Sequence, residues 1–171
     1  MALVAETLVE EWLNRKGYFT IRGIRTGSGE IDLLAASFRE PDALHVEVTV
    51  SADPIGYVGR DAGGSYVKKR TPEEVEAGAE EWFTRKFRGK GMRVARRREE
   101  LCPDRDWRFM LVHGNLKYPE ELDSMRERGV EAKHIGEVLE ELADRKRAFV
   151  TSSEASGVAE LFDIFRKDRG S

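Results

Sequence analysis

The chain has 171 residues, of which 40% are hydrophobic and 36% are charged. This composition is typical of one globular domain with a full core, and it argues against a disordered chain or a membrane protein. No apolar run approaches the roughly 20 residues that span a bilayer, and residues 1–12 lack the basic start of a signal peptide. The single cysteine, Cys102, excludes an intrachain disulfide and indicates a cytoplasmic location.

The net charge of −3 is unevenly distributed along the chain. Residues 85–98 contain eight basic side chains and no acidic one, a local density that suits phosphate binding. The same run also fits a solvated loop and helix end, where cations favour the negative pole of the helix dipole. Charge alone leaves both interpretations open.

Hydrophobic spacing and turn residues predict a series of helices and strands. In chain order we expect a helix at 3–15, strands at 18–24, 31–36 and 44–50, a loop at 51–69, a helix from 71 to about 87, a strand at 107–113, a short helix at 119–127, a strand at 132–135, and helices at 135–145 and from 151. This order predicts an α/β fold in which helices, including extra C-terminal ones, flank a mixed sheet. We expect one domain over residues 1–150 and a C-terminal helix over 151–171 that packs on the domain or on a partner.

Two carboxylates interrupt apolar strands. Asp32 is flanked by isoleucine and leucine, and Glu47 is flanked by two valines. Carboxylates avoid such positions unless they are paired, hydrogen-bonded or bound to a cation. If the two strands form a hairpin, both acids can project from one face, where a hard divalent cation relieves their repulsion. The competing interpretation places each acid on the solvated face of a half-exposed sheet.

Four neighbouring residues are further candidates. Glu30 and His45 each lie two residues from one of these acids and share its face, so each is either an additional ligand or an ordinary solvated side chain. Arg22 and Arg25 flank the same region, where they can hold phosphates or serve solubility alone.

The segments Gly-Glu-Ile-Asp-Leu-Leu-Ala at 29–35 and Val-Glu-Val-Thr at 46–49 follow a helix that carries Glu6. This arrangement resembles the core of the PD-(D/E)xK nucleases. The segment at 5–18 makes the chain most similar to archaeal Holliday junction resolvases and their small bacterial relatives. The resemblance covers roughly residues 3–113 and implies a restriction-endonuclease-like sheet.

The resemblance implies a metal-dependent endonuclease that hydrolyses DNA phosphodiester bonds, including branched, repair or recombination DNA. It implies Mg²⁺ or Mn²⁺ as cofactor, held by Glu6, Asp32, Glu47 and the main-chain carbonyl of Val48. The basic residues expected to grip the DNA backbone are Arg22, Arg25, Arg70, Lys86, Arg88, Arg96 and Arg97. Because relatives are often dimers, a homodimer is a further expectation, and no membrane partner is expected.

Thr49 departs from the pattern, because the family has a lysine at this place that helps to activate water and stabilises charge on the phosphate. A basic residue from elsewhere can fill the space, with Lys68, Lys69 and Lys86 as the candidates. Alternatively, the metal alone activates water at a reduced rate. In the third interpretation the site is inactive, and the chain is a nucleic-acid-binding or protein-interaction module. Whether the chain is an enzyme depends on this choice.

Overall fold

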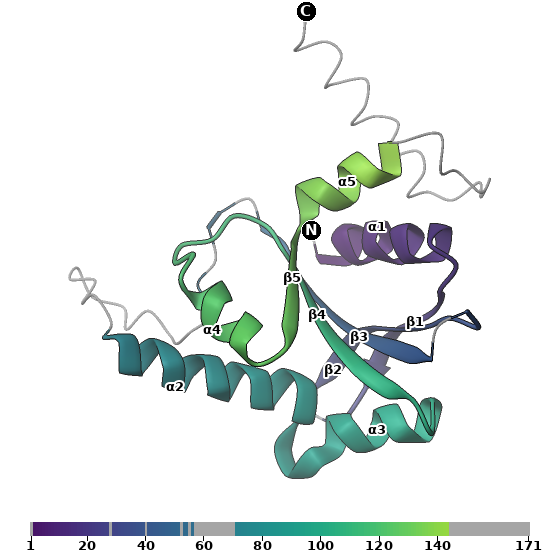
Figure 1. The fold of residues 1–171 in the computed structure, drawn as a ribbon, viewed down its shortest axis with the longest axis horizontal. Helices are drawn as coiled ribbons and strands as arrows, with labels where there is room; N and C mark the ends of the chain where they lie inside the picture. The colour runs from purple at the N-terminus through teal and green to yellow at the C-terminus, as the bar shows by residue number, and fades with distance from the viewer. Residues whose placement is uncertain are drawn as a thin grey trace, which may run out of the picture.

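The computed structural model describes residues 2–27, 29–39, 41–51, 53–54, 56 and 71–143. An open five-stranded sheet crosses the described part of the chain in the order β1-β2-β3-β4-β5 (Figure 1). Its strands are β1 (Phe19–Arg25), β2 (Glu30–Ala36), β3 (Asp42–Thr49), β4 (Asp106–His113) and β5 (Val130–His134). The first three strands form an antiparallel meander, and β3, β4 and β5 run parallel. The predicted α/β fold with a mixed sheet is therefore confirmed.

Helices cover both faces of this sheet (Figure 1). One face carries α1 (Ala2–Arg15) and α5 (Ile135–Ala143). The other face carries α2 (Pro72–Phe83), the π-helical turn η1 (Thr84–Arg88), the 3-10 turn η2 (Lys90–Met92), α3 (Arg93–Leu101) and α4 (Glu121–Glu127). No described helix is both long and apolar enough to cross a membrane.

Side-chain alternation in β3 divides its residues between the two faces. Leu44, Val46 and Val48 belong to the core beneath α1 and α5. His45 and Glu47 face the opposite side, where His45 meets the ring of Phe87 from η1. Both polar side chains are fully buried, so the solvated-face interpretation of Glu47 and the surface interpretation of His45 are wrong.

The end of α2 sets the position of the basic residues that follow it. The helix begins with the expected capping box between Thr71 and Glu74. Regular α-helix ends at Phe83, and the backbone N–H of Gly89 donates to the carbonyl of Thr84, five residues earlier, at 2.7 Å. Gly89 has a φ of +71°, and a Cβ there would lie 2.5 Å from a methyl group of Val94. Glycine therefore permits both the turn and the close approach of α3.

The helix α3 was not predicted from the sequence. It contains few large apolar residues, because most of its side chains are charged, so the usual helical stripe of hydrophobic residues is weak. Several other predictions lie outside the described residues. These are most of the loop at 51–69, the boundary at residue 150, the helix at 151–171, and the side chains of Lys68, Lys69 and Arg70.

Replacing Phe87 by alanine is expected to destabilise the fold by about 3–5 kcal/mol, the usual cost of removing a buried phenylalanine. Its side chain is fully buried and contacts the rings of Trp82, Phe83 and Phe109. Urea titration measures the change. Phe38→Ala is the matched control, because Phe38 is 87% exposed and its loss should change stability by about 0.5 kcal/mol or less. Equal losses in the two variants would contradict this assignment of the core.

Candidate functional site

Glu47 places a carboxylate in the middle of the sheet with no exposure to solvent. Its Oε1 is 2.9 Å from Nε2 of His45, and its Oε2 forms an ion pair with Nζ of Lys86, which belongs to η1. Burial raises the pKa of Glu47, and the charge and hydrogen bond of Lys86 oppose that rise. Both carboxylate oxygens are thus held by side chains, one from the same strand and one from the helical segment above it.

His45 is held in turn by Arg98, a buried residue of α3. Nη1 of Arg98 lies 2.9 Å from Nδ1 of His45, and a guanidinium can only donate. The imidazole proton is therefore on Nε2, which donates to Glu47. Burial, with the charges of Arg98 and Lys86, lowers the pKa of His45 well below its usual value, so the ring is neutral. We call Arg98, His45, Glu47 and Lys86 the Glu47 network.

Arg98 also ties this network to the aromatic core. Its Nη1 donates to the carbonyl of Phe87 at 2.5 Å, and its guanidinium lies over the rings of Trp107 and Phe109. Burial lowers the pKa of Arg98 to about 10, which leaves it charged at neutral pH. Both interpretations of the basic run, phosphate binding and a solvated helix end, require an accessible Arg98, whereas the structure buries this side chain.

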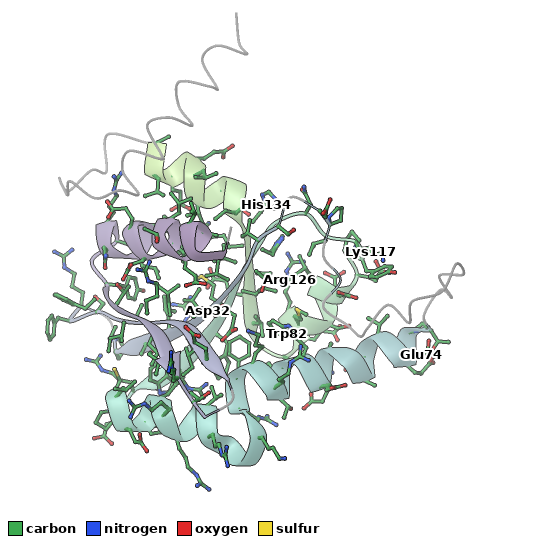
Figure 2. The ribbon with its side chains drawn as sticks, turned by 180° about the vertical axis from the view of Figure 1, so that it is seen from behind. Asp32, Glu74, Trp82, Lys117, Arg126 and His134 are labelled. Atoms are coloured by element: carbon green, nitrogen blue, oxygen red, sulfur yellow. The ribbon has the colours of Figure 1, made fainter. Side chains whose placement is uncertain are left out.

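Asp32 lies beside Glu47 on the adjacent strand. Its Oδ2 accepts a hydrogen bond of 2.7 Å from the backbone N–H of Val48. Burial and the charge of Glu47 raise the pKa of Asp32 to about 6, against the opposing effects of the Val48 N–H and of Lys86. Figure 2 shows Asp32 at the centre of the fold, far from Glu74 and Lys117. The structure therefore brings the two predicted strand acids together in a setting that does not fully balance their charge.

Lys86 is the one lysine candidate within the described residues. It is half-buried against Glu47. Burial alone lowers the pKa of Lys86, but the ion pair with Glu47 and the charge of Asp32 outweigh this effect and raise it above its usual value. Lys86 is therefore protonated at neutral pH. Its place in a π-helical turn is of interest because such turns occur frequently at functional sites.

Glu6, on α1, is electrostatically coupled to this pair. Burial, followed by the charge of Asp32, raises the pKa of Glu6, and Arg22 opposes the rise. In the present side-chain positions, however, no three His, Cys, Asp or Glu residues of the described part of the chain are gathered closely enough to hold a metal ion. Asp32 and Glu47 are thus neighbours, and Glu6 is a third acid within electrostatic reach. Thr49 ends β3 opposite His113 of β4.

The arginines predicted to grip DNA lie on two separate parts of the fold. Arg22 and Arg25 are on the edge strand β1, where Arg22 pairs with Glu10 at 3.3 Å. The others that the structure describes are Arg88 in η1 and Arg96 and Arg97 in α3, all of them exposed. Only the second group is continuous with Lys86. The sequence missed Arg98 as a partner of His45, because a contact between residues 53 positions apart leaves no local signal.

Comparisons with known proteins add little to these observations. No family profile and no curated protein sequence matches the chain. Among solved structures, the chain is similar to AF1548, a protein of unknown function, with a TM-score of 0.46 and 14% sequence identity. The match covers 80% of this chain and 65% of AF1548, so the chain spans about two-thirds of that protein's length.

Replacing Asp32 by asparagine is expected to remove a pH-dependent loss of stability. The Asp32 carboxyl titrates near 3.8 when unfolded and near 6 when folded, so the folded chain binds more protons between these values. The stability contributed by Asp32 is therefore present below about pH 4 and lost as the pH rises through about 6. Relative to the unmodified chain, Asp32→Asn should gain stability between these limits.

Urea titrations at a series of pH values measure this difference directly. Asp106→Asn serves as the control, because Asp106 is exposed at the start of β4. A stability difference between Asp32→Asn and the unmodified chain that stays constant with pH would contradict the raised pKa.

Proposed function

We propose that the chain is a metal-dependent nuclease of the PD-(D/E)xK kind that hydrolyses phosphodiester bonds in DNA. The observation that carries this proposal is the ion pair between Lys86 and the buried Glu47, beside Asp32. The resemblance places a lysine two residues after Glu47, where Thr49 stands. Lys86 brings an ammonium group to the same carboxylate from a different element, which supports a displaced lysine over a lost one.

The acids of the site suit a hard divalent cation. Asp32 and Glu6 have pKa values raised by burial and by neighbouring carboxylates, which indicates an excess of negative charge that a cation can offset. In this proposal Asp32, Glu47 and Glu6 hold Mg²⁺ or Mn²⁺. Such a cation, when bound, supplies an activated water and neutralises charge on the phosphate.

Lys86 acts in this proposal as a hydrogen-bond donor and a positive charge, because its raised pKa keeps it protonated. Hydrolysis forms a bond between water oxygen and phosphorus and breaks a phosphorus–oxygen ester bond. Negative charge builds on the phosphate oxygens as this happens, and a fixed ammonium stabilises it. His45 and Arg98 keep Glu47 in one orientation, so that Lys86 is positioned against a fixed partner.

A DNA-binding module without cleavage is the second candidate. It is favoured by the engagement of both Glu47 oxygens with His45 and Lys86, and by the lack of a gathered set of three metal ligands among the described residues. This candidate predicts DNA affinity that weakens steeply with salt and no cleavage with any metal. The two candidates therefore separate in one assay.

The purified chain, incubated with Mg²⁺ or Mn²⁺, is expected to cleave at least one of branched, single-stranded and duplex DNA. Chelation of the metal should stop the reaction. Asp32→Ala should abolish it, because this variant removes one of the two central acids, whereas the exposed Asp106→Ala should retain it. Gel analysis of end-labelled DNA measures the rates. Cleavage that survives Asp32→Ala at the same rate would rule out this site.

Replacing Lys86 by methionine is expected to lower the cleavage rate about 10²–10³-fold, the usual effect of removing one donor that stabilises transition-state charge. Lys86→Arg keeps the charge and should retain more activity than Lys86→Met. Lys117→Met is the matched control, since Lys117 is exposed and distant from Asp32 (Figure 2). Thermal unfolding of each variant shows whether it is folded. A folded Lys86→Met that cleaves at the unmodified rate would contradict the role of Lys86.

A further inference from the structure

A cavity of about 360 Å³ opens next to the Glu47 network, between the β1–β2 turn and the segment from η1 to α3. Its lining residues are Thr26, Gly29, Glu30, Arg85, Lys86, Gly89, Lys90, Arg93 and Val94. We call it the Arg93 pocket. Lys86 lines this cavity and also pairs with Glu47, so the pocket and the acidic site share one side chain.

The charges around the Arg93 pocket are not balanced by the residues that the structure describes. Among the described residues, Arg85, Lys90 and Arg93 form no ion pair, whereas Arg97, on the same helix as Arg93, pairs with Glu100. Glu30 is the one carboxylate among the described lining residues. Three unpaired cations against one acid make this described part of the wall net positive, and Lys86 is already matched by Glu47.

Two further features of the Arg93 pocket support a ligand-binding site. The hydroxyl of Thr26 is buried and has no hydrogen-bond partner among the described residues, although buried polar atoms are nearly always satisfied. Arg93 lies against the β1–β2 turn, because a Cβ added at Gly27 would be 3.0 Å from its Nη1. Thr26 and Arg93 both line the cavity, so its wall includes a residue with an unsatisfied hydroxyl and an arginine that bridges two elements.

We propose that the Arg93 pocket binds a phosphate group of a nucleic-acid strand, with Arg93, Lys90 and Arg85 as the cationic contacts and Thr26 as a hydroxyl contact. The volume is at the lower end of ligand pockets, which begin near 300 Å³, and accommodates a phosphate with its sugar. This inference rests on the proposed function and deepens it, because a strand phosphate held here lies beside the bond presented to Asp32 and Glu47.

The test measures binding without cleavage. Fluorescence anisotropy of a short single-stranded oligonucleotide, labelled at its 3′ end, is recorded in EDTA over a range of salt concentrations. Arg93→Ala should weaken binding about tenfold, as expected for the loss of one charge-assisted hydrogen bond. It should also reduce the slope of log affinity against log salt by about 0.7, the value for one phosphate contact on a single strand.

Two variants distinguish specific phosphate binding in the Arg93 pocket from nonspecific electrostatic attraction to basic side chains. Arg96→Ala removes the same charge from the same helix, but Arg96 is exposed and does not line the cavity. Arg96→Ala should reduce the slope of log affinity against log salt, but it should weaken binding less than the tenfold expected for Arg93→Ala. Thr26→Val removes the hydroxyl without any change in charge, and it should weaken binding while leaving the salt slope intact. Thermal unfolding checks that all variants are folded.

Oligonucleotides with a 5′-phosphate or a 5′-hydroxyl identify which phosphate is bound. Tighter binding of the 5′-phosphorylated strand that is lost in Arg93→Ala indicates a terminal phosphate. Equal weakening of both strands by Arg93→Ala indicates an internal phosphate. Both results support the pocket.

The inference is overturned if Arg93→Ala weakens binding no more than Arg96→Ala, or if the unmodified chain does not bind the strand. Its failure is distinct from failure of the proposed function. Metal-dependent cleavage without a specific effect of Arg93→Ala on binding would support the nuclease activity and contradict phosphate binding in the Arg93 pocket. A specific loss of binding in Arg93→Ala, without cleavage under any metal, would support phosphate binding in the pocket and contradict the nuclease activity.

Discussion

The burial of the Glu47 carboxylate is the constraint on which the rest of the site depends. An unpaired charge inside a sheet costs several kcal/mol. The oxygens of the Glu47 carboxylate therefore need partners that are held in fixed positions. His45 supplies one from the same strand, and Lys86 supplies the other from η1. Arg98 fixes the tautomer of His45 and binds the carbonyl of Phe87. One acid thus joins β3, η1 and α3.

The local geometry of η1 allows Lys86 to act as a partner of the buried Glu47 carboxylate. The π-helical turn is followed by Gly89, whose positive φ and lack of a side chain allow α3 to pack closely through Val94. Phe87 fills the core from this turn, while Lys86 reaches Glu47 and Arg85 lines the neighbouring cavity. Among the described residues Asp32 has no such dedicated cation, and its pKa rises to about 6. Glu47 therefore has a dedicated cation, and Asp32 is the acid whose charge a bound cation would most directly offset in the proposed function.

Strand residues were predictable from the sequence, and contacts between distant elements were not. Alternation in residues 44–50 placed His45 and Glu47 on one face, and an acid inside each of two apolar strands identified Asp32 and Glu47 as neighbours. Lys86 could be named only among three candidates, because its approach depends on how η1 packs on the sheet. The helix α3 was missed for a related reason. Its buried side includes Arg98, and an arginine that packs inward has the same appearance in sequence as one that faces solvent.

A crystal structure of the chain grown with Mn²⁺, with anomalous diffraction to locate the metal, tests the central claim most directly. The claim is that Lys86 serves the acidic site in place of the lysine absent at residue 49. We expect an anomalous peak at the carboxylates of Asp32 and Glu47, with the ammonium group of Lys86 remaining at the site. A site without metal at saturating Mn²⁺, or a Lys86 side chain turned into solvent away from the acids, would contradict the account.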